Sequence, residues 1–217
     1  MFALERPEFT YRLKYERGES VRFVSHLDLV KVFERALRRA SVDVLYSEGF
    51  NPRMLLVFGN PLPVGFTSSS EFVDIKTGTC YECSDLIGTL NDHLPGDIKI
   101  VSGSILVKPY DSIVSSIRFN KYHVYTDASP EAAAILLRDH ETSETIETVK
   151  RSKSGPKTVD IKKMIRYFGY EGDGLFIIET SGTQENNLRP DLALRTFAER
   201  NALEIRMLHI HKIDSMP

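Results

Sequence analysis

The sequence predicts an α+β protein made of two tandem ferredoxin-like (split βαβ) domains, with antiparallel sheets that carry helices on one face. Strict alternation of apolar and polar residues at 9–15 indicates a half-buried strand. A helical apolar period follows at 25–40. The order strand, helix, strand, strand, helix, strand then recurs in the second half of the chain, which predicts a repeat of element order.

The composition is that of an ordinary globular protein. The 217 residues are 41% hydrophobic and 27% charged, with a net charge of -2, so any polyanion-binding surface has to be a local patch. No apolar run approaches the roughly 20 residues that a membrane helix needs. The N-terminus lacks a signal pattern, and two cysteines do not make a disulfide scaffold. We therefore expect a cytoplasmic protein with no membrane partner.

The first half begins with the strand at 9–15, followed by a second short strand or hairpin continuation at 21–24. Ser25 has the character of a helix N-cap, with Asp28 three positions on as a short version of the capping box. The buried stripe expected for this helix comprises Leu27, Val30, Phe33, Leu37 and Ala40. The later elements expected here are strands at 54–58, 71–76 and 98–106 and a helix at 84–94.

Residues 109–111 (Pro-Tyr-Asp) indicate a boundary, which gives a first domain at 1–109 and a second at 110–217. Ser129-Pro130 predicts a helix that starts with proline at its first position. The elements expected in the second half are strands at 117–125, 145–150, 175–180 and 203–213 and helices at 130–138 and 191–200.

A basic insert at 150–166 interrupts this order. It carries seven basic side chains against one acid, Asp160, and its Ser-Gly-Pro turn predicts a hairpin tip, with a short helix starting at 160–164. Such side chains can follow a phosphate backbone, although charge runs are also common on loops without function. The nucleic-acid or anion-binding candidates in the insert are Lys150, Arg151, Lys153, Lys157, Lys162 and Lys163.

His26 and Asp28 are the candidate catalytic residues. A helix N-terminus suits an anion, and histidine can act as an acid or base near neutral pH, with Asp28 as its orienter or a nucleophile. The alternative is that Ser25 and Asp28 cap the helix and His26 packs at its base, which explains the spacing completely.

Further binding candidates lie on the same helix and on the following loop. A phosphate-binding cluster of Arg35, Arg38, Arg39 and Arg53 competes with a solvated helix face paired internally, for example Glu34 with Arg38. The loop after Ser47 offers Gly49, Phe50 and Asn51 for backbone approach, ring stacking and edge recognition. Its alternative is a tight turn with Phe50 in the core.

Metal and cofactor chemistry has little support. Cys80 and Cys83 form one CxxC without a second pair, and His123, His209 and His211 lack a clearly placed carboxylate. We expect neither metal nor cofactor. The chain contains no GxxxxGKS, GxGxxG or GxSxG motif, no radical-enzyme cysteine triplet and no standard RNA-recognition motif.

The stretch 22–65 contains a dense set of motifs: Phe23, Ser25-His26-Leu27-Asp28, Arg35-Ala36-Leu37-Arg38-Arg39-Ala40, Tyr46-Ser47, Gly49-Phe50-Asn51-Pro52, Pro61-Leu62-Pro63-Val64-Gly65 and, later in the chain, Val159-Asp160-Ile161. In these residues the chain resembles the radical-SAM-linked domain family, whose members occur as separate chains or fused behind a radical SAM enzyme. One departure is that Arg53-Met54 stand where the family often has a histidine and a proline.

The resemblance implies association with radical SAM chemistry and no defined reaction. We expect a non-catalytic RNA-binding or substrate-presenting partner of a separately encoded radical SAM enzyme acting on tRNA or rRNA. One alternative is an RNA-modifying or RNA-cleaving enzyme that uses His26 and Asp28. A second is an adaptor that docks a protein, which an exposed apolar patch around Phe50, Pro61 and Pro63 would favour.

Overall fold

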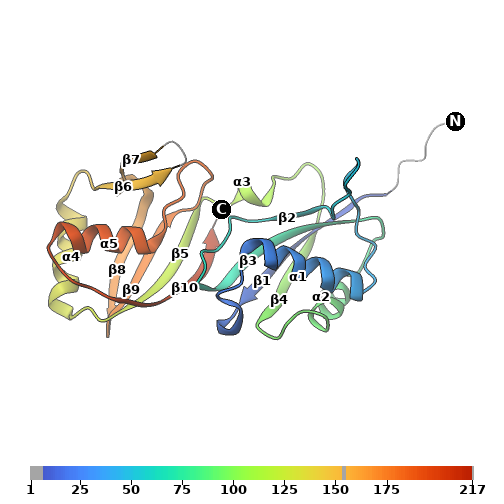
Figure 1. Ribbon diagram of the computed structural model, residues 1–217, viewed down its shortest axis with the longest axis horizontal. Coiled ribbons are helices and arrows are strands. Elements are labelled where there is room, and N and C mark those ends of the chain that lie inside the picture. The colour runs from blue at the N-terminus through green and yellow to red at the C-terminus, as the bar shows by residue number, and fades with distance from the viewer. Residues whose placement is uncertain (1–6, 153–154, 217) are drawn as a thin grey trace. The chain divides into compact units, whose positions relative to one another are not determined.

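A computed structural model of the chain describes residues 7–152 and 155–216. The chain divides into two compact units, Met1–Ser116 and Ile117–Pro217, each with its own strands and helices (Figure 1). All neighbouring strands within each unit are antiparallel, so the predicted α+β class with antiparallel sheets is confirmed. None of the helices in the described part of the chain has the length and apolar character needed to cross a membrane.

The first unit has the element order strand, helix, strand, strand, helix, strand, followed by a short helix. Its strands lie side by side in the order β4-β1-β3-β2. The elements are β1 (Phe9–Arg17), the 3-10 helix η1 (Glu19–Val21), α1 (His26–Arg39), β2 (Leu56–Phe58), β3 (Thr67–Thr77), α2 (Cys83–Asn91), β4 (Ile98–Leu106) and α3 (Ile113–Ser116).

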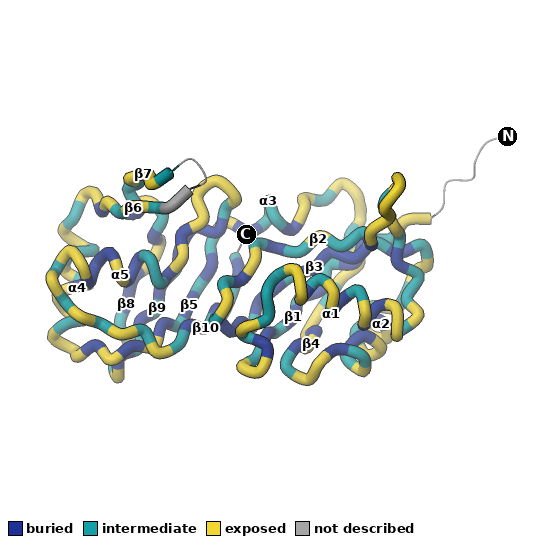
Figure 2. The backbone as a smooth tube through the Cα atoms, in the orientation of Figure 1, coloured by how far each residue is buried: buried dark blue, intermediate teal, exposed yellow. Residues whose placement is uncertain are grey.

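The core of the first unit confirms the alternation predicted for β1. Tyr11, Leu13 and Tyr15 are buried in the core with residues of α1 and α2, whereas the residues between them face the other side of the sheet. Figure 2 shows much of the backbone of the central strands as buried. The helix stripe differs from the prediction at its start. The buried residues of α1 are Leu29, Phe33, Ala36 and Leu37. Leu27 is 72% exposed, because at 100° per residue it lies off the centre of this stripe.

The strand expected at 21–24 is wrong. Residues Glu19–Val21 form η1, and the backbone then turns directly into α1. The carbonyl oxygens of Val21, Arg22 and Val24 accept hydrogen bonds from the guanidinium of Arg17. These oxygens are therefore taken by a side chain and do not form a strand ladder.

The second unit has the strand order β10-β5-β9-β8, with a separate two-stranded sheet β6-β7. Helix α4 packs against β8, and α5 contacts β5 and β9. The elements are β5 (Phe119–Thr126), α4 (Pro130–Thr142), β6 (Glu147–Ser152), β7 (Gly155–Asp160), the 3-10 helix η2 (Lys162–Met164), β8 (Ile165–Gly172), β9 (Leu175–Ser181), α5 (Pro190–Arg200) and β10 (Met207–Met216).

The sequence does not predict the strand at 165–172. The strand predicted at 145–150 forms, but it lies in a separate two-stranded sheet and not in the main sheet. β6 pairs with β7 as a hairpin, while β8 takes the place beside β9. A hairpin that satisfies its own backbone hydrogen bonds does not need the main sheet. The predicted hairpin around Gly155 and the short helix before residue 165 are both confirmed.

Two glycines at the β8–β9 turn test how closely this turn approaches the end of β5. Gly172 and Gly174 have positive φ values of 101° and 76°, but only a Cβ on Gly174 would lie 2.1 Å from the carbonyl oxygen of Thr126. We expect Gly172→Ala to cost about 1 kcal/mol of unfolding free energy for its backbone conformation. Gly174→Ala should cost a further ~1–3 kcal/mol for the overlap.

Urea unfolding of both variants measures this difference. Equal losses at the two positions would contradict the close approach of the turn to β5.

Candidate functional site

A buried arginine organises the start of α1. Arg17, the last residue of β1, is only 2% exposed. Its guanidinium donates hydrogen bonds to the carbonyl oxygens of Val21, Arg22 and Val24. Burial lowers the pKa of Arg17, and the charge of Glu71, buried on β3, opposes that shift. Loop 18–25 is thereby held against the end of the sheet, which fixes where α1 begins.

The predicted helix cap is confirmed. Ser25 has an extended backbone, and its Oγ accepts a hydrogen bond from the Asp28 N–H at 3.2 Å. The Asp28 carboxylate accepts from Ser25 Oγ at 2.8 Å and from Lys31 Nζ at 3.1 Å. These two donors, Ser25 first, lower the pKa of Asp28. Its contacts are therefore those of a capping residue.

His26 occupies a different environment from Asp28. Its ring is half-buried and meets Phe58 edge-on, with ring centroids 5.5 Å apart. Burial lowers the pKa of His26, the positive charge of Arg17 lowers it further, and Glu71 opposes both. The imidazole is therefore neutral at pH 7, which is the form that accepts a proton. His26 faces the buried charges of the sheet end, whereas Asp28 faces Ser25 and Lys31.

The loop after Ser47 is a closed tip that presents Phe50 to solvent. The Ser47 N–H donates to the Arg53 carbonyl oxygen at 2.8 Å, and the Arg53 N–H donates to Ser47 Oγ at 3.0 Å. Gly49 has a φ of 120°, which favours glycine there. Phe50 is fully exposed, so the alternative that placed it in the core is wrong.

The loop and His26 lie at opposite ends of the unit. His26 contacts Phe58, which pairs with Val73, whereas Val44, just before the loop, bridges to Thr77 at the far end of β3. Helix α1 runs between these ends, and its 14 residues span about 21 Å (Figure 1). The helix start and the loop therefore form two separate surfaces.

The arginines of α1 also do not gather with the loop. Arg38 pairs with Glu34 at 3.8 Å, as in the predicted internal pairing. Arg39 donates to the backbone oxygen of His93, which follows α2. Arg35 and Arg53 are exposed on α1 and on the loop. No contact among the described residues joins these four arginines into one cluster.

The basic insert divides into bound and exposed cations. Lys150 Nζ donates to the Asn187 carbonyl oxygen at 2.8 Å, and Lys162 Nζ donates to the backbone oxygen of His140. Lys157 and Lys163 are exposed. The side chain of Arg151 and all of Lys153 lie outside the described residues.

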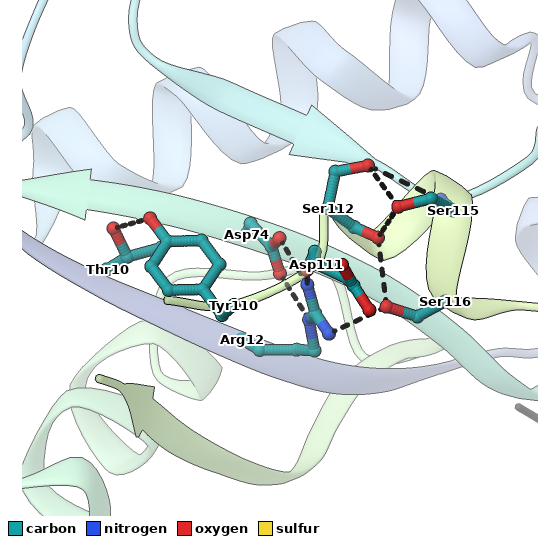
Figure 3. A network of polar contacts seen from close by, with 8 residues as sticks. All are labelled: Thr10, Arg12, Asp74, Tyr110, Asp111, Ser112, Ser115 and Ser116. Atoms are coloured by element: carbon teal, nitrogen blue, oxygen red, sulfur yellow. Dashed lines mark hydrogen bonds and ion pairs between the residues drawn. The ribbon is translucent and has the colours of Figure 1, made fainter. Parts of the chain in front are cut away.

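A polar network that the sequence does not predict lies on the open face of the first sheet (Figure 3). Arg12 on β1 forms a two-pronged ion pair with Asp74 on β3, with both N···O distances 2.8 Å. The same guanidinium donates to the Asp111 carbonyl oxygen at 2.7 Å and to Ser116 Oγ at 3.3 Å. The network fastens the segment after β4 to the sheet. No local pattern signals it, because its partners are 62 to 104 residues apart.

A second missed feature is an exposed apolar patch at the start of α1, formed by Phe23, Leu27 and Val64. These side chains are 68%, 72% and 57% exposed. The Gly65 N–H donates to the Arg22 carbonyl oxygen at 2.8 Å, which holds the proline-rich turn beside Phe23. The only sign of this patch in the sequence is the presence of apolar residues in the segment that caps α1. The helical period wrongly placed Leu27 in the core.

Metal-ligand geometry is not found in the described residues. No group of three or more His, Cys, Asp or Glu side chains there is placed to hold an ion. His123 and His211 pair across β5 and β10, and Tyr125 stacks on His209.

A family model matches residues 10–190 and is described as an uncharacterized protein conserved in bacteria (DUF2344). The chain belongs to this family. That description names no reaction and no partner, so a link between this DUF2344 protein and a radical SAM enzyme stays a prediction. A search of curated proteins finds no match.

Among solved structures, the chain is similar to one in the "Crystal Structure of a Cbf5-Nop10-Gar1 Complex". The match has a TM-score of 0.51 at 10% identity and covers 95% of this chain. The DUF2344 chain spans about half of that protein, since 48% of its length is covered. The similarity extends to the fold alone.

The environment of His26 predicts a pH dependence of stability. Burial lowers the pKa values of His26, His123 and His140 below the ordinary 6.5. The unfolded chain therefore binds protons first as the pH falls. We expect the unfolding free energy to be constant above about pH 6.5 and to decrease below it through these residues.

Denaturant unfolding between about pH 5 and about pH 7.5 tests this expectation. His26→Gln should make the curve flatter than that of the unchanged protein. Identical slopes would show that His26 is not held in its neutral form.

Proposed function

We propose that the chain is a non-catalytic RNA-binding partner of a separately encoded radical SAM enzyme that acts on tRNA or rRNA. The observation that supports RNA binding is the fully exposed ring of Phe50 on a tip closed by two Ser47–Arg53 hydrogen bonds. An aromatic ring left in water on a tied loop has no packing role in the core. It is available for stacking on an unpaired base.

The neighbours of Phe50 suit the same role. Asn51 offers an amide that can pair with a base edge, and Arg53 places a guanidinium on the same exposed tip. The exposed Lys157 and Lys163 of the second unit add positive charge for a phosphate backbone. Because the net charge of the chain is -2, we expect this binding to be local and salt-sensitive.

We also infer that each unit is a ferredoxin-like domain. The strand orders β4-β1-β3-β2 and β10-β5-β9-β8 support this, since each places the first and third strands of its unit at the centre. In the second unit the β6–β7 hairpin is then an insertion before the second strand of the repeat.

A second candidate function is protein docking through the Phe23–Leu27–Val64 patch. Several large apolar side chains exposed around one helix start are typical of an interaction site. This surface is compatible with the first proposal, because a partner enzyme needs a contact distinct from the RNA-binding tip. The catalytic alternative is less well supported, since Asp28 is engaged by Ser25 and Lys31.

Phe50→Ala tests RNA binding. Loss of one stacked base should raise the Kd for single-stranded RNA roughly 5- to 150-fold at low salt. Phe50→Tyr keeps the ring and should bind nearly as well as the unchanged protein. Tyr167→Ala removes another exposed ring, on β8, and should have no effect.

Filter-binding titrations at two salt concentrations provide the measurement. Equal affinity of Phe50→Ala and Tyr167→Ala would exclude the tip as the RNA contact.

The docking surface is tested with Leu27→Ser, which removes an exposed apolar side chain. We expect it to weaken co-purification with the radical SAM enzyme while leaving RNA binding intact. The matched control is Ile135→Ser on α4, since Ile135 is also an exposed apolar residue on a helix. Unchanged recovery of the enzyme with Leu27→Ser would place the contact elsewhere.

A further inference from the structure

The second unit contains a pocket of about 480 Å³ where β6 faces the start of α5. Lys150 reaches it from β6, and Asn187, Arg189, Asp191 and Arg195 reach it from the loop before α5 and from the helix itself. Three of these side chains are cationic and one is a carboxylate. The pocket therefore carries two more positive than negative charges, although the chain as a whole is negative.

Lys150 is held inside this pocket. Its Nζ donates to the Asn187 carbonyl oxygen at 2.8 Å and approaches Met164 Sδ at 3.7 Å. An ammonium group has three donors, and a sulfur atom is a weak acceptor. Burial lowers the pKa of Lys150. An anion placed in the pocket would favour the charged ammonium and supply a stronger acceptor than sulfur.

The two arginines face one carboxylate. The Arg189 guanidinium binds Asp191 through both prongs at 2.9 and 2.8 Å, and Arg195 lies 4.0 Å from the same carboxylate. Asp191 thus orients both guanidinium groups at the rim. Asp191 neutralises one of the two positive charges, and the side chains of Arg189 and Arg195 both remain about half exposed.

The start of α5 adds to the positive potential. Arg189 is the N-cap residue, and its side chain makes no capping hydrogen bond. Pro190 stands at the first helical position, and Leu192 of the first turn lines the pocket. The positive end of the α5 dipole therefore opens toward the same space as Lys150 and Arg195.

We propose that this pocket binds a phosphoryl group. A tetrahedral oxyanion accepts hydrogen bonds from an ammonium and from guanidinium forks at the same time, and the volume leaves room for the group to which the phosphate is esterified. The ligand is a small phosphate ester or a phosphodiester of a nucleic acid. The inference does not depend on RNA binding by Phe50, because the pocket lies in the second unit and the tip in the first.

Calorimetric titration of the full chain with inorganic phosphate, against sodium chloride at equal ionic strength, tests this proposal. We expect saturable phosphate binding that Arg195→Gln and Lys150→Met each weaken about tenfold or more, as befits a charge-assisted hydrogen bond. Arg138→Gln, which removes an exposed cation on α4 that does not line this pocket, is the matched control and should bind phosphate normally.

Absence of phosphate binding beyond that of chloride would overturn the proposal, as would equal affinity of Arg195→Gln and Arg138→Gln. Arg195 is half exposed, so its variant should fold even if Lys150→Met does not. Competition by a short oligonucleotide without terminal phosphates would identify a phosphodiester ligand, and its failure a phosphate ester. Phe50→Ala should leave phosphate binding unchanged, which separates this result from the RNA-binding test.

Discussion

The buried guanidinium of Arg17 is the interaction on which the first unit depends. Arg17 ends β1, donates hydrogen bonds to the carbonyl oxygens of Val21, Arg22 and Val24, and lies near the buried charge of Glu71. A buried cation is stable only when its donors are satisfied, so these carbonyl oxygens cannot be released without a large penalty. The loop is therefore rigid, and α1 starts at one place with His26 above the charged end of the sheet.

This rigid start has a consequence for the surface. The loop is tied from inside by Arg17 and packs Val21 into the core, whereas Phe23 of the loop and Leu27 of the first turn of α1 remain exposed. The Phe50 tip is rigid for a different reason, the reciprocal Ser47–Arg53 hydrogen bonds. One small unit thus presents two apolar contacts separated by the length of α1. This arrangement suits a protein that holds a nucleic acid with one end and a protein with the other.

In the second unit, a run of basic residues in the sequence does not form one continuous basic surface in the structure. The sequence of the insert at 150–166 suggests one basic surface, yet its lysines have different partners in the structure. Lys162 supports the end of α4 through His140, and Lys150 turns toward Asn187 and the arginines that precede and follow Asp191. Only the remaining exposed lysines face solvent as the composition suggests. The positive charge is concentrated in a pocket that includes Arg189 and Arg195, which lie outside the basic run.

The sequence alone determined the features that depend on local spacing. The alternation in β1, the Ser25 cap, the presence of helix α1 and the pairing of β6 with β7 as a hairpin are all encoded within a few residues, and each is confirmed. Tertiary structure decided the features that depend on distant partners. The Arg12–Asp74 pair, the electrostatic interaction of Arg17 with Glu71, the pairing of β8 with β9, and the exposure of Leu27 and Phe50 follow from which surfaces meet. Periodicity specifies which face of an element is apolar, but it cannot specify how far the neighbouring element extends to cover that face.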